Sequence, residues 1–172
     1  MNNISLIGFM GSGKTTIGKR ISEIKNLAFY DIDAMIVDEA QKSIADIFDE
    51  FGEAHFRLLE TNMIKSLKSV KNAVISCGGG AALFDENIRI LREISTVVYL
   101  QASVDKILAN LESLENEDTR PLLLGSEPKA KVERILKIRK PIYMKSCHIS
   151  VDVTKFNVDE AALKLLGLLE RL

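Results

Sequence analysis

The stretch NISLIGFMGSGKTTIG at residues 3–18 decides the fold. Its apolar run at 4–7 predicts a buried strand, and residues 8–15 fit the pattern G-x-x-x-x-G-K-[ST] of a phosphate-binding P-loop. Glycines let successive backbone N–H groups turn toward one phosphate, and a helix beginning near Gly13 points its positive end at the same place. A chance match in a glycine-rich turn is the alternative. We favour the P-loop because the motif lies between a strand and a helix.

The side chains of this loop suit a nucleotide. Lys14 can reach the β- and γ-phosphates, and the hydroxyl of Thr15 can ligate Mg²⁺. We therefore expect ATP as one ligand and Mg²⁺ as the cofactor.

The composition excludes several other classes of protein. The 172 residues suffice for one domain with a sizeable core. The formal charge of −1 gives no reason to expect a nucleic-acid partner, and no apolar run approaches the ~20 residues of a membrane span. Two cysteines are too few for a disulfide scaffold or a zinc site. With no sign of a signal peptide, we expect buried thiols in a cytoplasmic protein.

Apolar runs of strand length alternate with helical periodicity along the chain. A helix is expected after each run, and the helix at 129–144 should kink or end at Pro141. This alternation predicts a parallel sheet with helices on both faces, a three-layer α/β domain. The strands are expected at 4–7, 27–30, 73–76, 96–100 and 148–153.

Two acidic residues follow the second predicted strand. Ligands bind at the carboxyl ends of strands in an open α/β sheet, so Asp31 and Asp33 could face one metal–phosphate site. The alternative is that Asp33 only caps the helix at 34–40. Beside a P-loop we favour the functional interpretation for the pair.

A helical arginine and a triple glycine are further candidates. Arg57 lies between Glu53 and Glu60 on a predicted helix, and on the helix alone a solvated salt bridge is the simpler interpretation. Residues 78–80 are three glycines directly after a strand, which would let the backbone approach a ligand closely. A flexible turn is the alternative there.

The segment at 112–128 has a different character from its surroundings. It is acidic at first and then contains prolines and a glycine, and its length suits a mobile lid. Arg120 within it is the cation that a closing lid would bring onto phosphate; an ordinary exposed loop arginine is the alternative.

The order of these pieces is more specific than any one of them. The chain resembles the shikimate kinase family, within the nucleoside-monophosphate-kinase-like P-loop proteins, over nearly its whole length. The matching stretches are IGFMGSGKTT at 7–16, DID at 31–33, GEAHFRLLE at 52–60, CGGG at 77–80, TRPLL at 119–123 and RKPIY at 139–143.

The resemblance implies a single kinase domain spanning 1–172, with a five-stranded parallel sheet of order 2-3-1-4-5. It implies a substrate-binding helical region at about 33–60 and a mobile lid at about 112–128. It also implies transfer of the γ-phosphoryl group of ATP to the 3-hydroxyl of shikimate, a step toward chorismate and the aromatic amino acids. We expect a monomer.

The family's roles are carried over residue by residue. The resemblance implies catalytic roles for Lys14, Asp33 and Arg120, with Asp33 orienting or deprotonating the acceptor hydroxyl. It implies a metal site at Thr15 and, through water, Asp31. Shikimate would contact Asp33, Arg57, Gly78, Gly79, Gly80 and Arg139, the two arginines clamping its carboxylate. ATP would contact Gly11, Ser12, Gly13, Lys14, Thr15, Thr16, Arg120 and Lys155.

Three positions depart from the family pattern. Cys77 precedes the triple glycine, at a position where relatives usually carry a hydroxyl group. That hydroxyl would help to hold a metal-bound water. Ser113 replaces an arginine that packs on adenine in many relatives, and Lys155 stands where relatives carry another arginine that lines the adenine pocket. Two other functions remain open: another small-molecule kinase on the same scaffold, for gluconate or a nucleotide, and a non-catalytic nucleotide-binding module.

Overall fold

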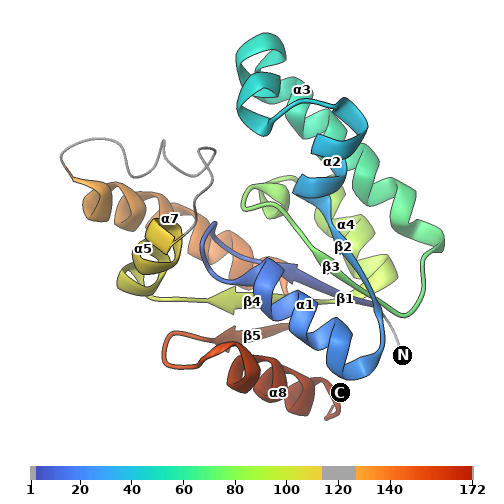
Figure 1. Ribbon diagram of the computed structural model, residues 1–172, viewed down its shortest axis with the longest axis vertical. Coiled ribbons are helices and arrows are strands. Elements are labelled where there is room, and N and C mark those ends of the chain that lie inside the picture. The colour runs from blue at the N-terminus through green and yellow to red at the C-terminus, as the bar shows by residue number, and fades with distance from the viewer. Residues whose placement is uncertain (1–2, 114–126, 172) are drawn as a thin grey trace.

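The computed structural model describes residues 3–113 and 127–171. Five strands form one parallel sheet in the order β2-β3-β1-β4-β5, which confirms the predicted architecture (Figure 1). The strands are β1 (Asn3–Ile7), β2 (Ala28–Asp31), β3 (Ala73–Ser76), β4 (Ser95–Gln101) and β5 (Ile149–Asp152).

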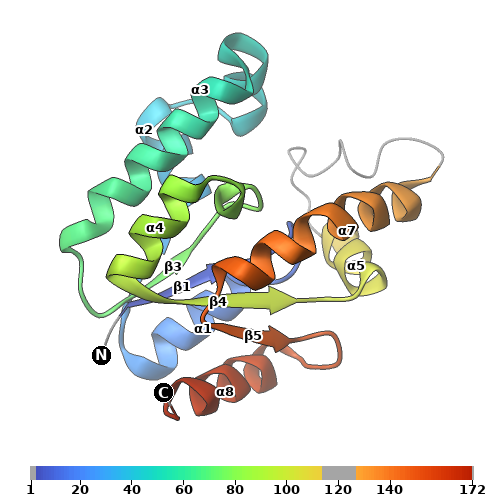
Figure 2. The same ribbon diagram turned by 180° about the vertical axis from the view of Figure 1, so that it is seen from behind.

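Helices cover both faces of this sheet. The α-helices are α1 (Lys14–Lys25), α2 (Ile32–Ala40), α3 (Ile44–Ser66), α4 (Asp85–Ile94), α5 (Val104–Ser113), α7 (Pro128–Ser146) and α8 (Val158–Leu169). Two short 3₁₀ turns, η1 (Leu67–Ser69) and η2 (Ala81–Leu83), flank β3. Helices α1 and α8 pack on one face, while α4 and α7 pack on the other (Figures 1 and 2).

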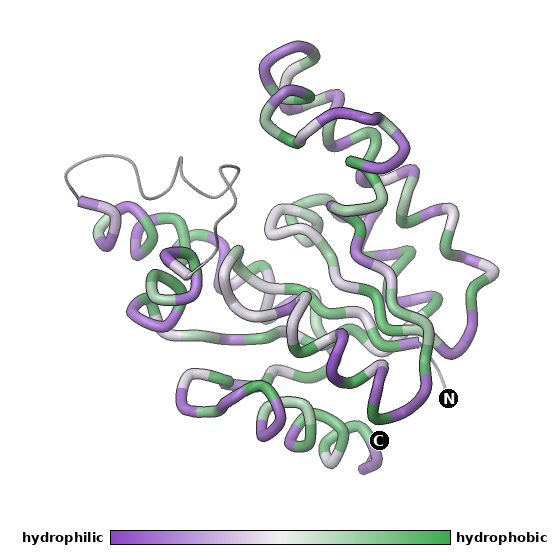
Figure 3. Tube along the Cα trace, in the orientation of Figure 1, coloured by the Kyte–Doolittle hydropathy of each residue, from purple (hydrophilic) through white to green (hydrophobic). Residues whose placement is uncertain are grey.

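The core is divided between the two faces by the strand pleat. Successive side chains of a strand point to opposite faces, so Leu6 packs beneath α1 and α8 whereas Ile7 packs beneath the helices opposite. Val74 and Ile75 of β3 divide in the same way. A parallel sheet buried on both faces needs continuous apolar strands, and the strands form the hydrophobic centre of the chain in Figure 3.

Helices α2 and α3 extend beyond the sheet. Ser43 caps α3 in a capping box with Asp46, an arrangement that the spacing Ser-x-x-Asp at the start of an apolar helical pattern favours. Gly52 interrupts α3 with φ 80°, a left-handed conformation that favours glycine, and divides the helix into two segments.

Two boundaries differ from the predictions. Helix α7 does not end at Pro141 but continues to Ser146. A proline removes one backbone donor, and packing of the buried Val132 and Tyr143 on either side of it holds the helix together. The proposed lid at 112–128 lies mostly outside the described residues; its first two positions belong to α5, and Pro128 begins α7. None of the described helices is long and apolar enough to cross a membrane.

Candidate active site

Three neighbouring strands bring the predicted site residues to one edge of the sheet. The P-loop follows β1, Asp31 ends β2, and the triple glycine follows β3. These strands are adjacent and parallel, so their carboxyl ends lie together, where ligands bind in open α/β sheets.

Lys14 is the buried cation of the P-loop. Its Nζ donates hydrogen bonds to the carbonyls of Gly8 at 3.0 Å and Phe9 at 2.8 Å. Burial lowers the pKa of Lys14, although the nearby charges of Asp33 and Asp31 oppose that shift. These two aspartates, at the end of β2 and the start of α2, are therefore close enough to stabilise the charged ammonium group.

The rest of the P-loop leads into α1. Gly13 precedes the helix with φ 90°, so the left-handed conformation favours glycine there. Ser12 is buried, while Thr15 and Thr16 are exposed at the start of the helix. Asn110 of α5 donates to the carbonyl of Gly11 at 2.7 Å, so the loop is anchored from the other side of the site.

Three oxygens lie together beside Thr15. Thr15 Oγ1 donates to Asp31 Oδ2 at 2.7 Å, and Ser76 Oγ lies 3.4 Å from the same hydroxyl. Asp31 Oδ1 also accepts from the backbone of Ala34, so Asp31 caps α2 and Asp33 does not. An all-oxygen set with one carboxylate suits Mg²⁺, which commonly keeps waters and shares phosphate oxygens. The residues present therefore fit the expected cofactor.

The structure places a serine, and not Cys77, beside this group. Successive residues at a strand end point in opposite directions. Ser76 faces Thr15, whereas the thiol of Cys77 packs in the hydrophobic cluster with Ile7 and Phe9. Burial raises the pKa of Cys77, so the thiol stays protonated. Sequence reasoning missed Ser76 because the family alignment drew attention to the next position.

A half-buried aspartate and a fully buried glutamate form the other half of the site. Asp33 Oδ1 and Glu60 Oε1 are buried and have no hydrogen-bond partner among the described residues. Burial raises the pKa of Asp33 to about 6, with a further contribution from Asp31. Burial also raises the pKa of Glu60 to about 7 against the opposing charge of Arg57. Orphaned acceptors of this kind indicate a place for donors from a ligand.

The glycine loop makes room for these side chains. A β-carbon on Gly78 would lie 2.6 Å from Asp33 Oδ1 and 2.7 Å from Glu60 Oε1. A β-carbon on Gly80 would lie 2.5 Å from Arg57 Nη2. The sequence suggested that these glycines let a ligand approach the backbone closely. The structure shows that Gly78 and Gly80 leave space for charged side chains of the site itself.

Arg57 forms ion pairs within its own helix and also lies at the candidate site. It pairs with Glu53 and with the fully buried Glu60, each at 3.1 Å. The sequence offered a helix salt bridge and a ligand contact as alternatives, and the salt bridge is present beside the triple glycine.

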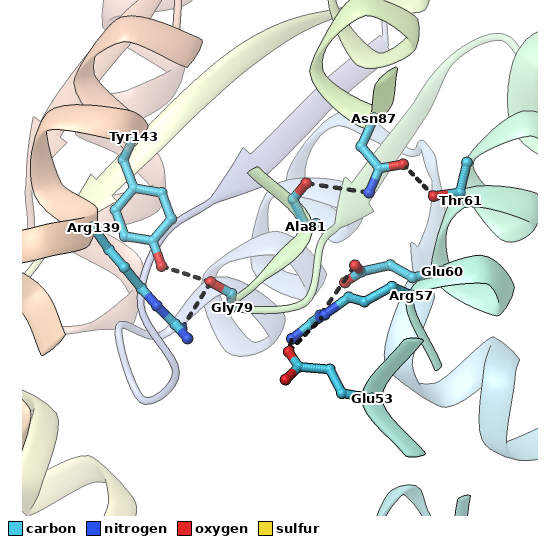
Figure 4. A network of polar contacts seen from close by, with 9 residues as sticks. All are labelled: Glu53, Arg57, Glu60, Thr61, Gly79, Ala81, Asn87, Arg139 and Tyr143. Carbon is cyan, nitrogen blue, oxygen red and sulfur yellow. Dashed lines mark hydrogen bonds and ion pairs between the residues drawn. The ribbon is translucent and has the colours of Figure 1, made fainter. Parts of the chain in front are cut away.

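Helix α7 supplies a second arginine. Arg139 Nη1 lies 3.4 Å from the carbonyl of Gly79, and Tyr143 Oη donates to the same carbonyl at 2.6 Å (Figure 4). Tyr143 is itself buried against Tyr99, with ring centroids 5.0 Å apart. The tyrosine thus fixes the glycine loop to α7. Sequence reasoning recorded Tyr143 only as part of the motif RKPIY, and it recorded Glu60 only as a salt-bridge partner of Arg57.

Two further predicted residues remain untested by this geometry. Arg120 lies outside the described residues. Lys155 is exposed in the turn after β5, and β4 separates that strand from β1. Its expected contact with the nucleotide stays a prediction.

A P-loop on a parallel sheet of order 2-3-1-4-5, facing a second site of carboxylates and arginines, defines the architecture of a small-molecule P-loop kinase. The sequence model of the shikimate kinase family matches residues 10–170. The chain belongs to the shikimate kinase family.

Individual relatives cover almost the whole chain. It is 40% identical to a shikimate kinase of Dictyoglomus turgidum over 166 residues, which are 96% of this chain and 95% of the relative. It is 39% identical to that of Caldicellulosiruptor bescii over 168 residues, covering 98% and 95%. The solved structure of a shikimate kinase from Acinetobacter baumannii in complex with shikimate superimposes with a TM-score of 0.91 at 34% identity, covering 99% and 94%.

Proposed function

We propose that this protein transfers the γ-phosphoryl group of ATP to the 3-hydroxyl of shikimate, giving shikimate 3-phosphate and ADP. The observation that carries the proposal is the pairing of two buried, unpartnered carboxylate oxygens with two arginines around one glycine loop. Shikimate presents hydroxyl donors and a carboxylate, which are the complements of those groups.

The acceptor's two ends would be bound differently. Asp33 and Glu60 would accept hydrogen bonds from hydroxyls near Gly78. Arg57 and Arg139 would donate to the carboxylate, because a guanidinium forms paired hydrogen bonds and stays charged. Gly79 would add a backbone contact.

The phosphate half would neutralise charge during transfer. The acceptor hydroxyl oxygen bonds to the γ-phosphorus as the bond to the bridging oxygen breaks, and ADP leaves. Lys14 and the backbone of residues 11–16 would hold the phosphates. Thr15 and, through water, Asp31 would hold Mg²⁺, which would supply positive charge to offset the charge on the phosphates. Arg120 is expected to add a cation from the lid.

Asp33 has one of two roles toward the hydroxyl proton. It takes the proton as a base, or it orients the hydroxyl while the proton leaves late in a loose transition state. Either role needs the ionised carboxylate. We further expect a monomeric cytoplasmic enzyme that acts in aromatic amino-acid synthesis.

The experiment is a coupled assay of ADP formation with Mg²⁺ and ATP, offering shikimate, gluconate and AMP separately. We expect turnover with shikimate alone. Turnover with gluconate or AMP instead would keep the P-loop mechanism and assign Arg57 and Arg139 to another ligand. A folded protein that binds ATP but uses no acceptor would support the non-catalytic alternative.

A further inference from the structure

The edge of the Arg57 guanidinium that could bind a ligand carboxylate already binds the exposed carboxylate of Glu53. Its Nε and Nη2 donate to the same oxygen, Oε1 of Glu53, at 3.2 and 3.1 Å. Its Nη1 donates to Glu60 Oε2 at 3.1 Å (Figure 4). The Nε–Nη2 edge is one of the two that bind a carboxylate bidentately, and here Glu53 occupies it.

The guanidinium itself has little freedom to turn away. It lies 5.2 Å from the ring of Phe56 and 5.7 Å from that of Phe84, and it lies against the α-carbon of Gly80. Only 13% of its side chain is exposed, and Glu60 on its other side is fully buried. A ligand must therefore bind the guanidinium where it lies.

Glu53 is the member of this group that can leave. Its side chain is 66% exposed, so its carboxylate regains water when the contact breaks. It is also the first residue after the break at Gly52, at the start of the second segment of α3. Because the glutamate end of the pair is exposed to water, the contact costs less to break than the contact of Arg57 with the buried Glu60.

The charges favour exchange over addition. At pH 8, above the raised pKa of Glu60, one guanidinium between two ionised glutamates leaves the trio at −1, with Asp33 close to the same loop. Adding another carboxylate to that group costs repulsion, whereas exchanging one carboxylate for another does not change the charge. Glu60 is buried and cannot be released cheaply.

We propose that Glu53 holds the place of the substrate carboxylate on Arg57 and is exchanged for it when the acceptor binds. The inference rests on the proposed function, since it takes a carboxylate-bearing acceptor as given. Its consequence is that Glu53 lowers the affinity for the acceptor.

The test is the affinity for shikimate of Glu53→Gln, measured by calorimetry at pH 8 and fixed salt. The amide removes the competing charge and preserves the shape. We expect the Kd of shikimate to fall about two- to fivefold. The neutral methyl ester of shikimate, which has the same hydroxyls, should bind both proteins equally.

The matched control is Glu50→Gln. It removes the same charge from the same helix three residues earlier, where the glutamate pairs with Lys42 and not with Arg57. Its Kd should equal that of the wild type. In an Arg57→Gln background, the gain from Glu53→Gln should disappear, because position 57 then carries no charge for either carboxylate to bind.

The outcomes separate this inference from the proposed function. Wild-type protein that does not bind shikimate overturns the proposed acceptor and this inference with it. If the wild type binds and Glu53→Gln binds equally or more weakly, the exchange is wrong and Glu53 only holds Arg57 in position. An equal gain with the methyl ester or with Glu50→Gln would also overturn it, by showing a general charge effect.

Discussion

The phosphate half and the acceptor half of this site are assembled in different ways. The phosphate half comes mainly from one continuous loop, residues 8–16, and its side chains bond to near neighbours: Lys14 to two loop carbonyls and Thr15 to Asp31. The acceptor half draws on α2, α3, the loop after β3 and α7, which are far apart in the sequence. Local sequence therefore determines the first half, and tertiary packing determines the second.

The halves also differ in the kind of buried polar group that lacks a partner among the described residues: in the phosphate half it is the neutral hydroxyl of Ser12. In the acceptor half two carboxylate oxygens are buried without a partner among the described residues, and burial raises the pKa of both groups. Such groups cost stability and commonly mark functional sites. The comparison predicts that changes in the acceptor half impair turnover and acceptor binding while ATP binding persists.

The largest expected effect is that of Asp33→Asn. An amide cannot take the hydroxyl proton and is a weaker acceptor, so kcat should fall by about 10²- to 10⁴-fold. The affinity for ATP, measured by calorimetry, should change little. Asp38→Asn, an exposed substitution on the same helix, should be without effect. Turnover of Asp33→Asn near the wild-type rate would end the assigned role, and a matching loss of ATP affinity would contradict the division into halves.

A smaller effect is expected from Gly80→Ala. The new methyl group would lie 2.5–2.6 Å from three atoms of the Arg57 guanidinium and displace it. Losing charge-assisted hydrogen bonds should raise KM for shikimate by about ten- to a hundredfold and leave KM for ATP nearly unchanged. The control is Gly167→Ala on α8, where a β-carbon meets nothing within 4 Å. Equal rises in both KM values would show that the loop serves both halves.

These differences explain how far sequence reasoning reached. The P-loop, the five strands and the capping of α3 follow from local patterns, and the structure confirms them. Ser76 was missed because its role depends on the strand pleat that turns it toward Thr15 and turns Cys77 away. Glu60 looked like a helix salt bridge because its burial depends on the glycine loop that packs against it. Pro141 was expected to kink or end a helix that packing sustains.

The pH dependence should separate activity from stability. The ionised Asp33 is needed for the acceptor, so kcat/KM for shikimate should fall about tenfold per pH unit below pH about 6. The free energy of unfolding should change with pH in the opposite direction. Because the pKa values of Asp33 and Glu60 are raised in the folded state, the folded protein favours their protonated forms. That stabilising contribution is full below pH about 4 and is lost as pH rises through about 6 and 7.

Glu60→Gln tests the stability part directly. Urea unfolding at pH 5 and pH 8 should show the wild type losing roughly 2–4 kcal/mol more than the variant over that interval. An equal loss in both proteins would mean that Glu60 does not titrate in this range. A kcat/KM profile that stays flat to pH 5 would argue against an ionised Asp33 in the mechanism.

The smallest expected effect concerns the boundary between the halves at the end of β3. Ser76 Oγ lies 3.4 Å from Thr15 Oγ1, whereas the thiol of Cys77 faces the hydrophobic core. Ser76→Ala should therefore weaken Mn²⁺ binding to the protein–ADP complex by about tenfold, measured by electron paramagnetic resonance of the free ion. Cys77→Ala should leave the Mn²⁺ affinity unchanged. If Cys77→Ser instead strengthens Mn²⁺ binding and Ser76→Ala has no effect, the hydroxyl that many relatives carry at the second position is the one that matters. In that case the thiol of Cys77 weakens the metal site relative to a hydroxyl. With the expected result, Ser76 already supplies the oxygen, so residue 77 can pack in the hydrophobic core without lowering the metal affinity.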